Sequence, residues 1–487
     1  MPVPSRLRRL TTAALPAVAA VVFAACDARY PNSVFTRHTD FNRDIAYLFD
    51  ILIWLGTAVF VFVEFILLYA IFRYRRKSEN DRPEHVHGNT TLEILWTAIP
   101  ALILAFIAVP TVRTIFKTQA RAKADALQVE VIGHQWWWEF RYPQYKITTA
   151  NELYLPVGRT VNFTLRSEDV LHSFWIPQLG GKRDLITNHP NYLWFTPDSA
   201  GVQAWNGMCV EYCGASHANM RFKAFTVTPA EFAQWAVHQQ SPAAFGAVAP
   251  PAPSAPSAAA GATGAAVPGA APAAATAPVT TGTATSPAQQ PQIAANAAGA
   301  RSPGTTVATP NAPPAAGGAN QPGAQNAPAM AGHDMAAMGG ATVQQAGYVS
   351  FPRDKLPPHV IPSTPLPAAL KYNDALVGDA ERGRQLLSTG QGGCVGCHTI
   401  NGNPVMMGVM GPNLTHVGSR TTIAGGLYPN DTKHLARWIK NARVMKPGVL
   451  MITLGKGEFD PVTKATAMMG LTDAQIADIV AYLQALK

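Results

Sequence analysis

One short segment of the sequence, residues 209–220, holds two thiols, an imidazole and a thioether. They belong to Cys209, Cys213, His217 and Met220. Soft sulfur ligands select copper, zinc or an iron–sulfur cluster, and a thioether beside them favours copper in electron transfer. Because there are two cysteines rather than one, each thiolate can bridge two metal ions. The segment therefore predicts a dinuclear copper site.

Such a site needs one more imidazole, and His172 is the candidate because it stands at the expected end of a strand. Two other interpretations of the thiols stay open, a zinc knuckle and a disulfide between Cys209 and Cys213. Neither of them requires Met220 or the Glu211 that lies between the thiols. The full set of side chains therefore favours copper.

A second redox motif lies far downstream, where Cys394, Cys397 and His398 form the pattern C-x-x-C-H. This pattern is typical of covalent haem attachment. The two thiols would form thioethers with the haem vinyl groups, and His398 would be the proximal iron ligand. The sequence therefore predicts haem c as a second cofactor.

The composition fits several domains rather than one. The chain has 487 residues, of which only 14% are charged, and its formal net charge is +9. This charge does not indicate a nucleic-acid partner, because no basic cluster with interleaved aromatic residues is present. All five cysteines have an assignment, one near the N-terminus, two in the copper segment and two in the haem motif. No pair remains for a structural disulfide.

The first residues resemble a targeting segment. Residues 1–26 begin with Arg6, Arg8 and Arg9 and continue as an apolar run that ends at Cys26. This pattern predicts a secretion signal. A cysteine directly after two alanines also predicts lipoprotein cleavage with lipidation of Cys26, while ordinary cleavage and an uncleaved anchor stay open.

Two apolar segments, at about 45–72 and 92–116, are each long enough to span a bilayer, for which about 20 residues suffice. They predict a transmembrane helical hairpin over residues 40–120. The basic residues between them, 73–77, belong on the cytoplasmic side. The copper and haem motifs are therefore expected on the periplasmic or extracytoplasmic side of a bacterial inner (plasma) membrane.

From residue 127 to 240 the pattern changes to short alternating runs, such as 129–132 and 160–165, which predict β-strands. Several strands separated by turns favour a sandwich or barrel with the metal ligands on end loops.

Residues 241–346 consist almost wholly of Ala, Pro, Gly, Thr, Gln and Ser. Such a segment cannot bury a core, so it predicts a disordered linker. Within it, Met330, His333, Met335 and Met338 raise the hypothesis of a transient Cu(I) site, against the simpler interpretation of compositional drift.

Residues 40 to about 237 resemble subunit 2 of the haem–copper cytochrome c oxidases, on the spacing of the copper segment and His172. Residues 347–487 resemble class I cytochrome c, on the haem motif, the helix start at 378–383 and the Gly-Pro-Asn-Leu at 411–414. Together they resemble the fused subunit 2 of a caa3-type oxidase. The resemblance implies a multidomain fold: a two-helix transmembrane hairpin, an all-β cupredoxin-like domain, a disordered Pro/Ala-rich linker and an all-α cytochrome c domain.

In that family the dinuclear CuA centre takes two bridging cysteines, two histidines, a methionine and a backbone carbonyl. Quinol-oxidising members lack these ligands, so the resemblance implies a cytochrome as the electron donor. The matching residues here are His172, Cys209, Glu211 through its main-chain oxygen, Cys213, His217 and Met220.

Further roles come only from the resemblance. The Glu211 side chain would ligate a magnesium ion shared with subunit 1. Trp136, the first of three adjacent tryptophans, would lie between the donor cytochrome and copper. Glu93 would stand at the mouth of a proton pathway into subunit 1, with a helix-start carboxylate as the alternative. Glu64 matches no motif of the family; as a costly carboxylate within an apolar segment, it is expected to pack against a partner subunit.

In the cytochrome-like part, the carbonyl of Pro412 would orient His398. Met451 follows a Lys-Pro-Gly segment that resembles the axial-methionine segment of related fused domains, so it is the expected sixth ligand. Met468 and Met469 are the alternatives.

Arg420 and Trp438 resemble residues that contact haem propionates, with an ordinary surface position as the alternative. Met406, Met407 and Met410 lie near the haem motif and are expected to be packing residues, the commoner fate of methionine.

The resemblance implies the electron-input subunit of a proton-translocating cytochrome c oxidase that reduces O2 to water. Its partners would be subunit 1 and other oxidase subunits, the lipid bilayer, and a cytochrome or respiratory complex as donor. The alternative is the input subunit of a CuA-type haem–copper nitric oxide reductase. A stand-alone electron carrier or copper-delivery protein would not need two spanning helices with buried carboxylates.

Overall fold

The computed structural model describes residues 32–76, 78, 87–198, 203–243, 356–468 and 470–487. The expected leader with Cys26 lies outside the described residues, and so does Met469. The same holds for the expected linker beyond Ala243, including the Met330 to Met338 cluster.

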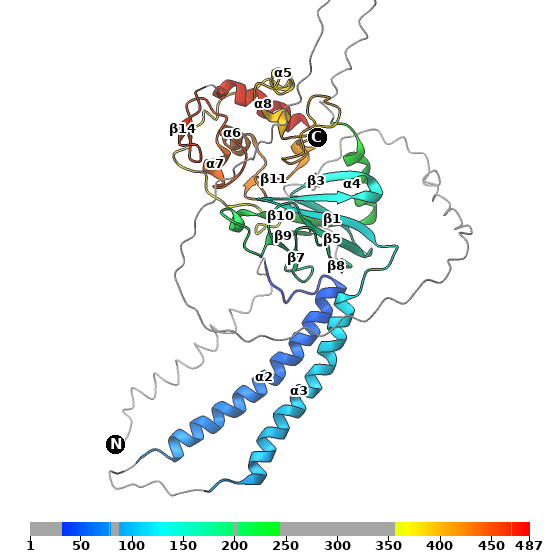
Figure 1. The fold of residues 1–487 in the computed structure, drawn as a ribbon, viewed down its shortest axis with the longest axis vertical. Coiled ribbons are helices and arrows are strands. Elements are labelled where there is room, and N and C mark those ends of the chain that lie inside the picture. The colour runs from blue at the N-terminus through cyan, green and yellow to red at the C-terminus, as the bar shows by residue number, and fades with distance from the viewer. Residues whose placement is uncertain (1–31, 77, 79–86, 199–202, 244–355, 469) are drawn as a thin grey trace, which may run out of the picture. The chain divides into compact units, whose positions relative to one another are not determined.

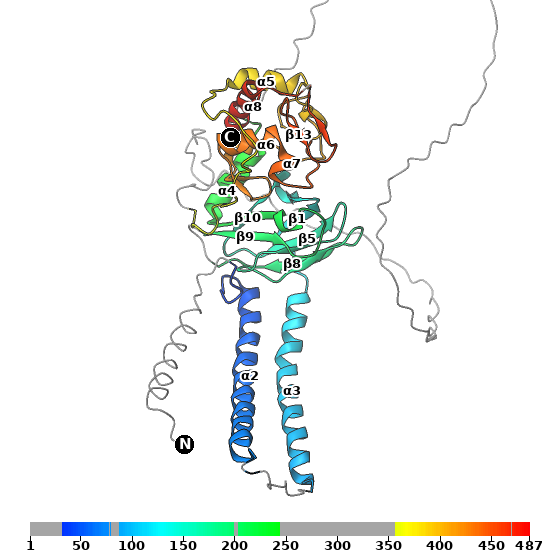
Figure 2. The same cartoon turned by 90° about the vertical axis from the view of Figure 1, so that its left-hand side faces the viewer.

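Two long helices follow the N-terminal segment, α2 (Asp40–Arg73) and α3 (Thr90–Gln119). They run side by side, as Figure 1 and Figure 2 show, and a salt bridge of 2.7 Å joins Lys117 to Asp44. Both are long and apolar enough to cross a membrane. Polar caps set the starts of the two helices, because the side chains of Thr39 and Asn89 accept hydrogen bonds from the first-turn amides. The two helices therefore agree with the predicted helical hairpin.

The β domain (residues 127–243) consists of two five-stranded sheets. Their orders are β3-β2-β1-β5-β8 and β4-β10-β9-β6-β7. Each sheet is mixed, because β1 pairs in parallel with β5 and antiparallel with β2, and β10 pairs in parallel with β4 and antiparallel with β9. The strands are β1 (Leu127–His134), β2 (Trp137–Tyr142), β3 (Ile147–Ala150), β4 (Glu152–Pro156), β5 (Val161–Ser167), β6 (His172–Trp175), β7 (Arg183–Leu185), β8 (Asn191–Phe195), β9 (Gln203–Cys209) and β10 (Arg221–Val227).

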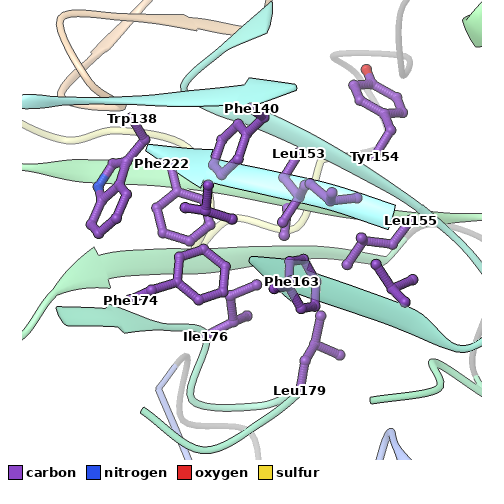
Figure 3. Packing of buried hydrophobic residues seen from close by; sticks show 14 of the residues in the cluster. Trp138, Phe140, Leu153, Tyr154, Leu155, Phe163, Phe174, Ile176, Leu179 and Phe222 are labelled. Carbon is purple, nitrogen blue, oxygen red and sulfur yellow. The ribbon is translucent and has the colours of Figure 1, made fainter. Parts of the chain in front are cut away.

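Aromatic side chains from both sheets meet in the core of the β domain (Figure 3). Phe174 and Phe222 stack with ring centroids 5.0 Å apart, and Trp138 packs edge-on against Phe174. Alternate residues of β5 are buried, as the period-two pattern of the sequence predicts. The domain also contains the short helices η1 (Pro143–Tyr145) and η2 (His217–Asn219) and the helix α4 (Pro229–Gln240).

The C-terminal domain (residues 356–487) packs short helices around a second core. Helix α5 crosses α8 closely, since a Cβ at Gly383 would lie 2.0 Å from the Asp478 carbonyl oxygen. The elements are α5 (Ala380–Ser388), η5 (Cys394–Gly396), η6 (Val417–Ser419), β11 (Thr422–Ile423), β12 (Tyr428–Pro429), α6 (Thr432–Lys440), α7 (Ala442–Met445), β13 (Phe459–Asp460), β14 (Ala465–Thr466) and α8 (Asp473–Ala485). The predicted fold class is therefore confirmed for the described residues.

Candidate copper and haem sites

The predicted copper ligands come together at one end of the β domain. His172 opens β6, and Cys209 closes the neighbouring strand β9. Cys213 lies in the loop that follows, His217 begins η2, and Met220 stands directly before β10. The pairing of β9 with both β6 and β10 brings the two ends of this loop beside His172.

The donor atoms form one compact group around the two thiols. The Sγ atoms of Cys209 and Cys213 are 3.7 Å apart, too far for a disulfide, and all the cysteines in the described part of the chain are free. His172 Nδ1 lies 3.8 Å from Cys209 Sγ, and His217 Nδ1 lies 3.6 Å from Cys213 Sγ. Met220 Sδ is 3.8 Å from Cys213 Sγ, and the Glu211 carbonyl oxygen is 3.2 Å from Cys209 Sγ. All six predicted donors are therefore gathered in one place.

The contact between the two thiols moves their pKa values in opposite directions. The hydrogen bond between them is the main cause that lowers the pKa of Cys209. The same contact, together with burial, raises the pKa of Cys213. The thiols would bind a metal ion as thiolates, so metal binding would release their protons. The donor set fits a dinuclear copper centre.

A carboxylate that the sequence analysis missed supports His172. His172 Nε2 donates to Asp169 Oδ1 at 2.8 Å, which leaves Nδ1 to face Cys209. Burial opposes a charged imidazole, but the hydrogen bonds to Asp169 and Cys209 outweigh it and raise the pKa of His172. The sequence feature that could have indicated this contact is the short spacing of Asp169 and His172 at the start of a strand. Gly133 is also needed here, because a Cβ would lie 2.7 Å from the His172 ring.

The three adjacent tryptophans have three different environments. Trp136 Nε1 donates to the Cys213 carbonyl oxygen at 2.9 Å, and the side-chain amide nitrogen of Gln135, Nε2, donates to the same oxygen at 2.7 Å. Trp137 stacks on His134 with ring centroids 4.1 Å apart, and Trp138 is fully buried in the core. Trp136 is thus bonded to Cys213, while Trp138 Nε1 donates to the Met220 carbonyl oxygen at 3.4 Å.

The haem motif occupies η5 and the residues after it. Cys394 is packed against the second core, and burial raises the pKa of this thiol to about 11. His398 Nδ1 donates to the Pro412 carbonyl oxygen at 2.8 Å, so Nε2 is left as the ligand atom. Burial lowers the pKa of His398, which keeps the imidazole in the neutral form that binds iron. These residues fit a covalently bound haem.

The candidate axial methionines differ in exposure. Met451 is half-buried, whereas Met468 is 69% exposed. The packing expected for the methionines near the haem motif is right only for Met406, which is fully buried. It is wrong for Met407 and Met410, which are 71% and 66% exposed, because the loop turns these side chains away from the core.

Two expected propionate contacts and two membrane carboxylates can also be placed. Arg420 donates to the Asn413 carbonyl oxygen, and Trp438 packs partly buried against the second core. Glu93 lies in the first turn of α3, as a helix-start carboxylate does, and Glu64 lies in the second half of α2.

Comparison with known proteins places these parts in a family. The family model "Cytochrome C oxidase subunit II, transmembrane domain" matches residues 38–114, and "Cytochrome C oxidase subunit II, periplasmic domain" matches residues 146–227. The model "Cytochrome c" matches residues 380–487. The probable cytochrome c oxidase subunit 2 of Rickettsia bellii is 30% identical over 218 residues, which cover 40% of this chain and 80% of that protein. The chain belongs to the cytochrome c oxidase subunit 2 family.

Other relatives have the same subunit name. Cytochrome c oxidase subunit 2 of Alkalihalophilus pseudofirmus is 39% identical over 194 residues, and the match spans 39% of this chain but only 56% of that relative. The solved periplasmic domain of subunit II of cytochrome oxidase from Bradyrhizobium japonicum is 30% identical, with a TM-score of 0.23, over 25% of this chain and 96% of that one.

Membership of the subunit 2 family gives the two sites their cofactor classes. The periplasmic-domain match implies CuA, and the cytochrome c match implies haem c. The transmembrane-domain match and the two apolar helices identify a membrane protein. The predicted resemblance to a subunit 2 with a C-terminal cytochrome c domain is thereby confirmed, and the order of the domains is consistent with the caa3 type.

Proposed function

We propose that this chain is the electron-input subunit of a proton-translocating cytochrome c oxidase. It accepts electrons at haem c, passes them to dinuclear CuA and delivers them to the haem–copper site of subunit 1, where O2 is reduced to water. The observation that carries the proposal is the gathering of all six donors around the Cys209 and Cys213 sulfurs, which lie 3.7 Å apart. A cytochrome or respiratory complex would be the outside donor.

At the copper site the chain holds a rigid set of donors. The copper ions would be held by the thiols of Cys209 and Cys213 together with His172, His217, Met220 and the Glu211 carbonyl. Bound there, the copper pair would supply a one-electron store. Asp169 and Gly133 keep the His172 ring in one orientation, so the ligands need little rearrangement when the charge changes.

At the haem site, His398 would be the proximal ligand, with Cys394 and Cys397 as the covalent anchors. The Pro412 carbonyl fixes the plane of the imidazole. Met451 is the proposed sixth ligand, since Met468 is largely exposed. Bound there, the haem would supply the first one-electron acceptor of the chain.

Three residues receive roles from the family. Trp136 would mediate electron input to copper, which its hydrogen bond to Cys213 supports. The exposed side chain of Glu211 would ligate magnesium together with subunit 1. Glu93 would serve a proton pathway of the partner subunit.

The proposed location is the bacterial inner (plasma) membrane, with both domains on the periplasmic or extracytoplasmic side. Arg73, the last residue of α2, and Arg75 and Arg76 just after it support a cytoplasmic turn between the helices. Subunit 1 and other oxidase subunits would cover the exposed apolar side chains of α2 and α3.

Oxygen consumption by the purified, membrane-extracted complex tests the proposal. With an artificial electron donor, the wild type should consume O2, Cys213→Ser should not, and Tyr212→Phe, an exposed neighbour in the same loop, should match the wild type. Turnover of nitric oxide alone would move the chain to the reductase alternative and withdraw the role of Glu93.

A further inference from the structure

A buried carboxylate of the β domain reaches into the C-terminal domain. Glu152, on β4, is only 3% exposed. Its Oε1 accepts hydrogen bonds from Thr421 N at 2.7 Å, Thr421 Oγ1 at 2.6 Å and Thr422 N at 3.2 Å. One oxygen thus satisfies three donors at the start of β11. Without an acceptor there, the two amides would be buried and unpaired.

A buried ammonium reaches in the opposite direction. Lys446, in the segment before Met451, is 3% exposed. Its Nζ donates to the Trp136 carbonyl oxygen at 2.6 Å and to the Ala424 carbonyl oxygen at 3.2 Å. One lysine therefore ties a loop of the C-terminal domain to the main chain of the tryptophan that is bonded to the copper loop.

The residues next to Lys446 complete this contact. The Ser216 hydroxyl donates to the Pro447 carbonyl oxygen. Gly448 has φ +95°, and a Cβ added to it would lie 3.0 Å from the Ala215 Cβ and 3.1 Å from the Trp136 ring. The Met451 segment thus packs directly on Trp136, which in turn donates to the Cys213 carbonyl oxygen at 2.9 Å.

From these contacts we propose that Glu152 and Lys446 are positioning residues that hold the C-terminal domain on the β domain, with Gly448 against Trp136. The inference rests on the proposed function for its purpose, because the arrangement makes the face of Trp136 the place where the chain's own haem domain delivers electrons. It goes further in naming the side chains that set the docked position. It also implies that an outside cytochrome reduces the C-terminal domain rather than the copper site directly.

The chemistry of the Glu152 contact allows a sharp test. All three donors point at one oxygen, Oε1, and burial raises the pKa of this carboxyl. Glu152→Gln keeps an acceptor oxygen at this place, whereas Glu152→Leu removes it at similar volume. Glu130→Leu, on an outward position of β1, is the matched control.

Two readouts on the intact complex separate docking from electron transfer. The first is hydrogen–deuterium exchange in the peptide that contains Thr421 and Thr422. The second is the rate of electron transfer from haem to CuA after flash reduction of the haem. Glu152→Leu should lose protection of that peptide and slow the transfer by about tenfold or more, while Glu152→Gln and Glu130→Leu stay near the wild type.

Lys446→Met should have the same two effects, with exposed Lys456→Met as its control. The near-infrared copper spectrum and the haem spectrum should not change in the Glu152 variants. Wild-type protection and transfer rate in Glu152→Leu would overturn the inference, and so would an equal loss in Glu152→Gln. If protection follows the expected pattern but the wild type shows no transfer from haem to copper, the docking stands and the proposed function fails.

Discussion

The indole nitrogen of Trp136 donates a hydrogen bond of 2.9 Å to the main-chain oxygen of Cys213. Cys213 is at the centre of the gathered donors, with Cys209, His217 and Met220 each within 3.8 Å of its sulfur. A side chain on the surface of the β domain is thereby joined to a proposed bridging ligand by one hydrogen bond. Trp138 also reaches a proposed ligand, through the Met220 carbonyl oxygen at 3.4 Å, but it is fully buried, whereas Trp136 is only partly buried.

Replacing Trp136 by phenylalanine should slow electron transfer into CuA without changing the copper spectrum. The variant keeps an aromatic ring but loses the hydrogen bond to Cys213. We expect a decrease of about fivefold or more, the factor that corresponds to the roughly 1 kcal/mol of one hydrogen bond. Flash reduction of the complex measures the rate. Trp137→Phe is the control, because Trp137 stacks on His134 instead; equal slowing in both variants would contradict the assignment.

Removing the carboxylate of Asp169 should weaken copper binding. Asp169 accepts a hydrogen bond from His172 Nε2 at 2.8 Å and one from the main-chain amide of Gln135 at 2.6 Å. Loss of the carboxylate would therefore free the ring of a proposed ligand. For Asp169→Ala we expect copper affinity to fall roughly 10- to 100-fold. A competition titration with a copper chelator checks this. The neighbouring Glu168→Ala should bind as the wild type does, and undiminished affinity in Asp169→Ala would show that the bond has no supporting role.

Mild acid should weaken the C-terminal domain through His416. Burial, together with the neighbouring His238, lowers the pKa of His416 to about 4 from 6.5, and Arg420 opposes its charge as well. The folded state then binds fewer protons than the unfolded state, so stability is complete above pH 6.5 and is lost as the pH falls towards 4. The full loss is at most about 3 kcal/mol.

Guanidinium unfolding followed at the Soret band, at pH 7 and at pH 4.5, measures this loss. In His416→Asn the decrease between the two pH values should be smaller than in the wild type. His434→Asn serves as the control, since His434 is hydrogen-bonded to Asp431 within its own helix turn. An unchanged pH slope in His416→Asn would assign the acid sensitivity to other groups.

The chemistry of this chain is readable from its sequence because the ligands are local. Cys209 to Met220 lie in one loop, and the haem motif occupies five consecutive residues, so residue type and spacing suffice. The two spanning helices and the alternating strands follow from hydropathy for the same reason. Only His172 had to be brought in from another strand, and its expected place at a strand end indicated it.

The supporting contacts were not predictable, because each joins segments that the sequence does not relate. Glu152 and Thr421 are 269 positions apart, and Lys446 reaches Trp136 over 310 positions. Lys446 belongs to the Lys-Pro-Gly run before Met451. It was therefore interpreted only as part of the expected axial-ligand segment of the haem. The packing predicted for Met407 and Met410 was wrong for a simpler reason. Composition does not tell which way the side chains of an irregular loop point.

The most direct test of the account is the oxidation of the C-terminal haem by oxygen in the fully reduced complex, followed by stopped-flow absorbance. The account predicts that this haem is oxidised at a catalytic rate in the wild type and in Tyr212→Phe. It predicts that the haem stays reduced in Cys213→Ser, because its electrons must pass the copper site. Equally fast oxidation in Cys213→Ser would show that electrons bypass that site, and would contradict the account.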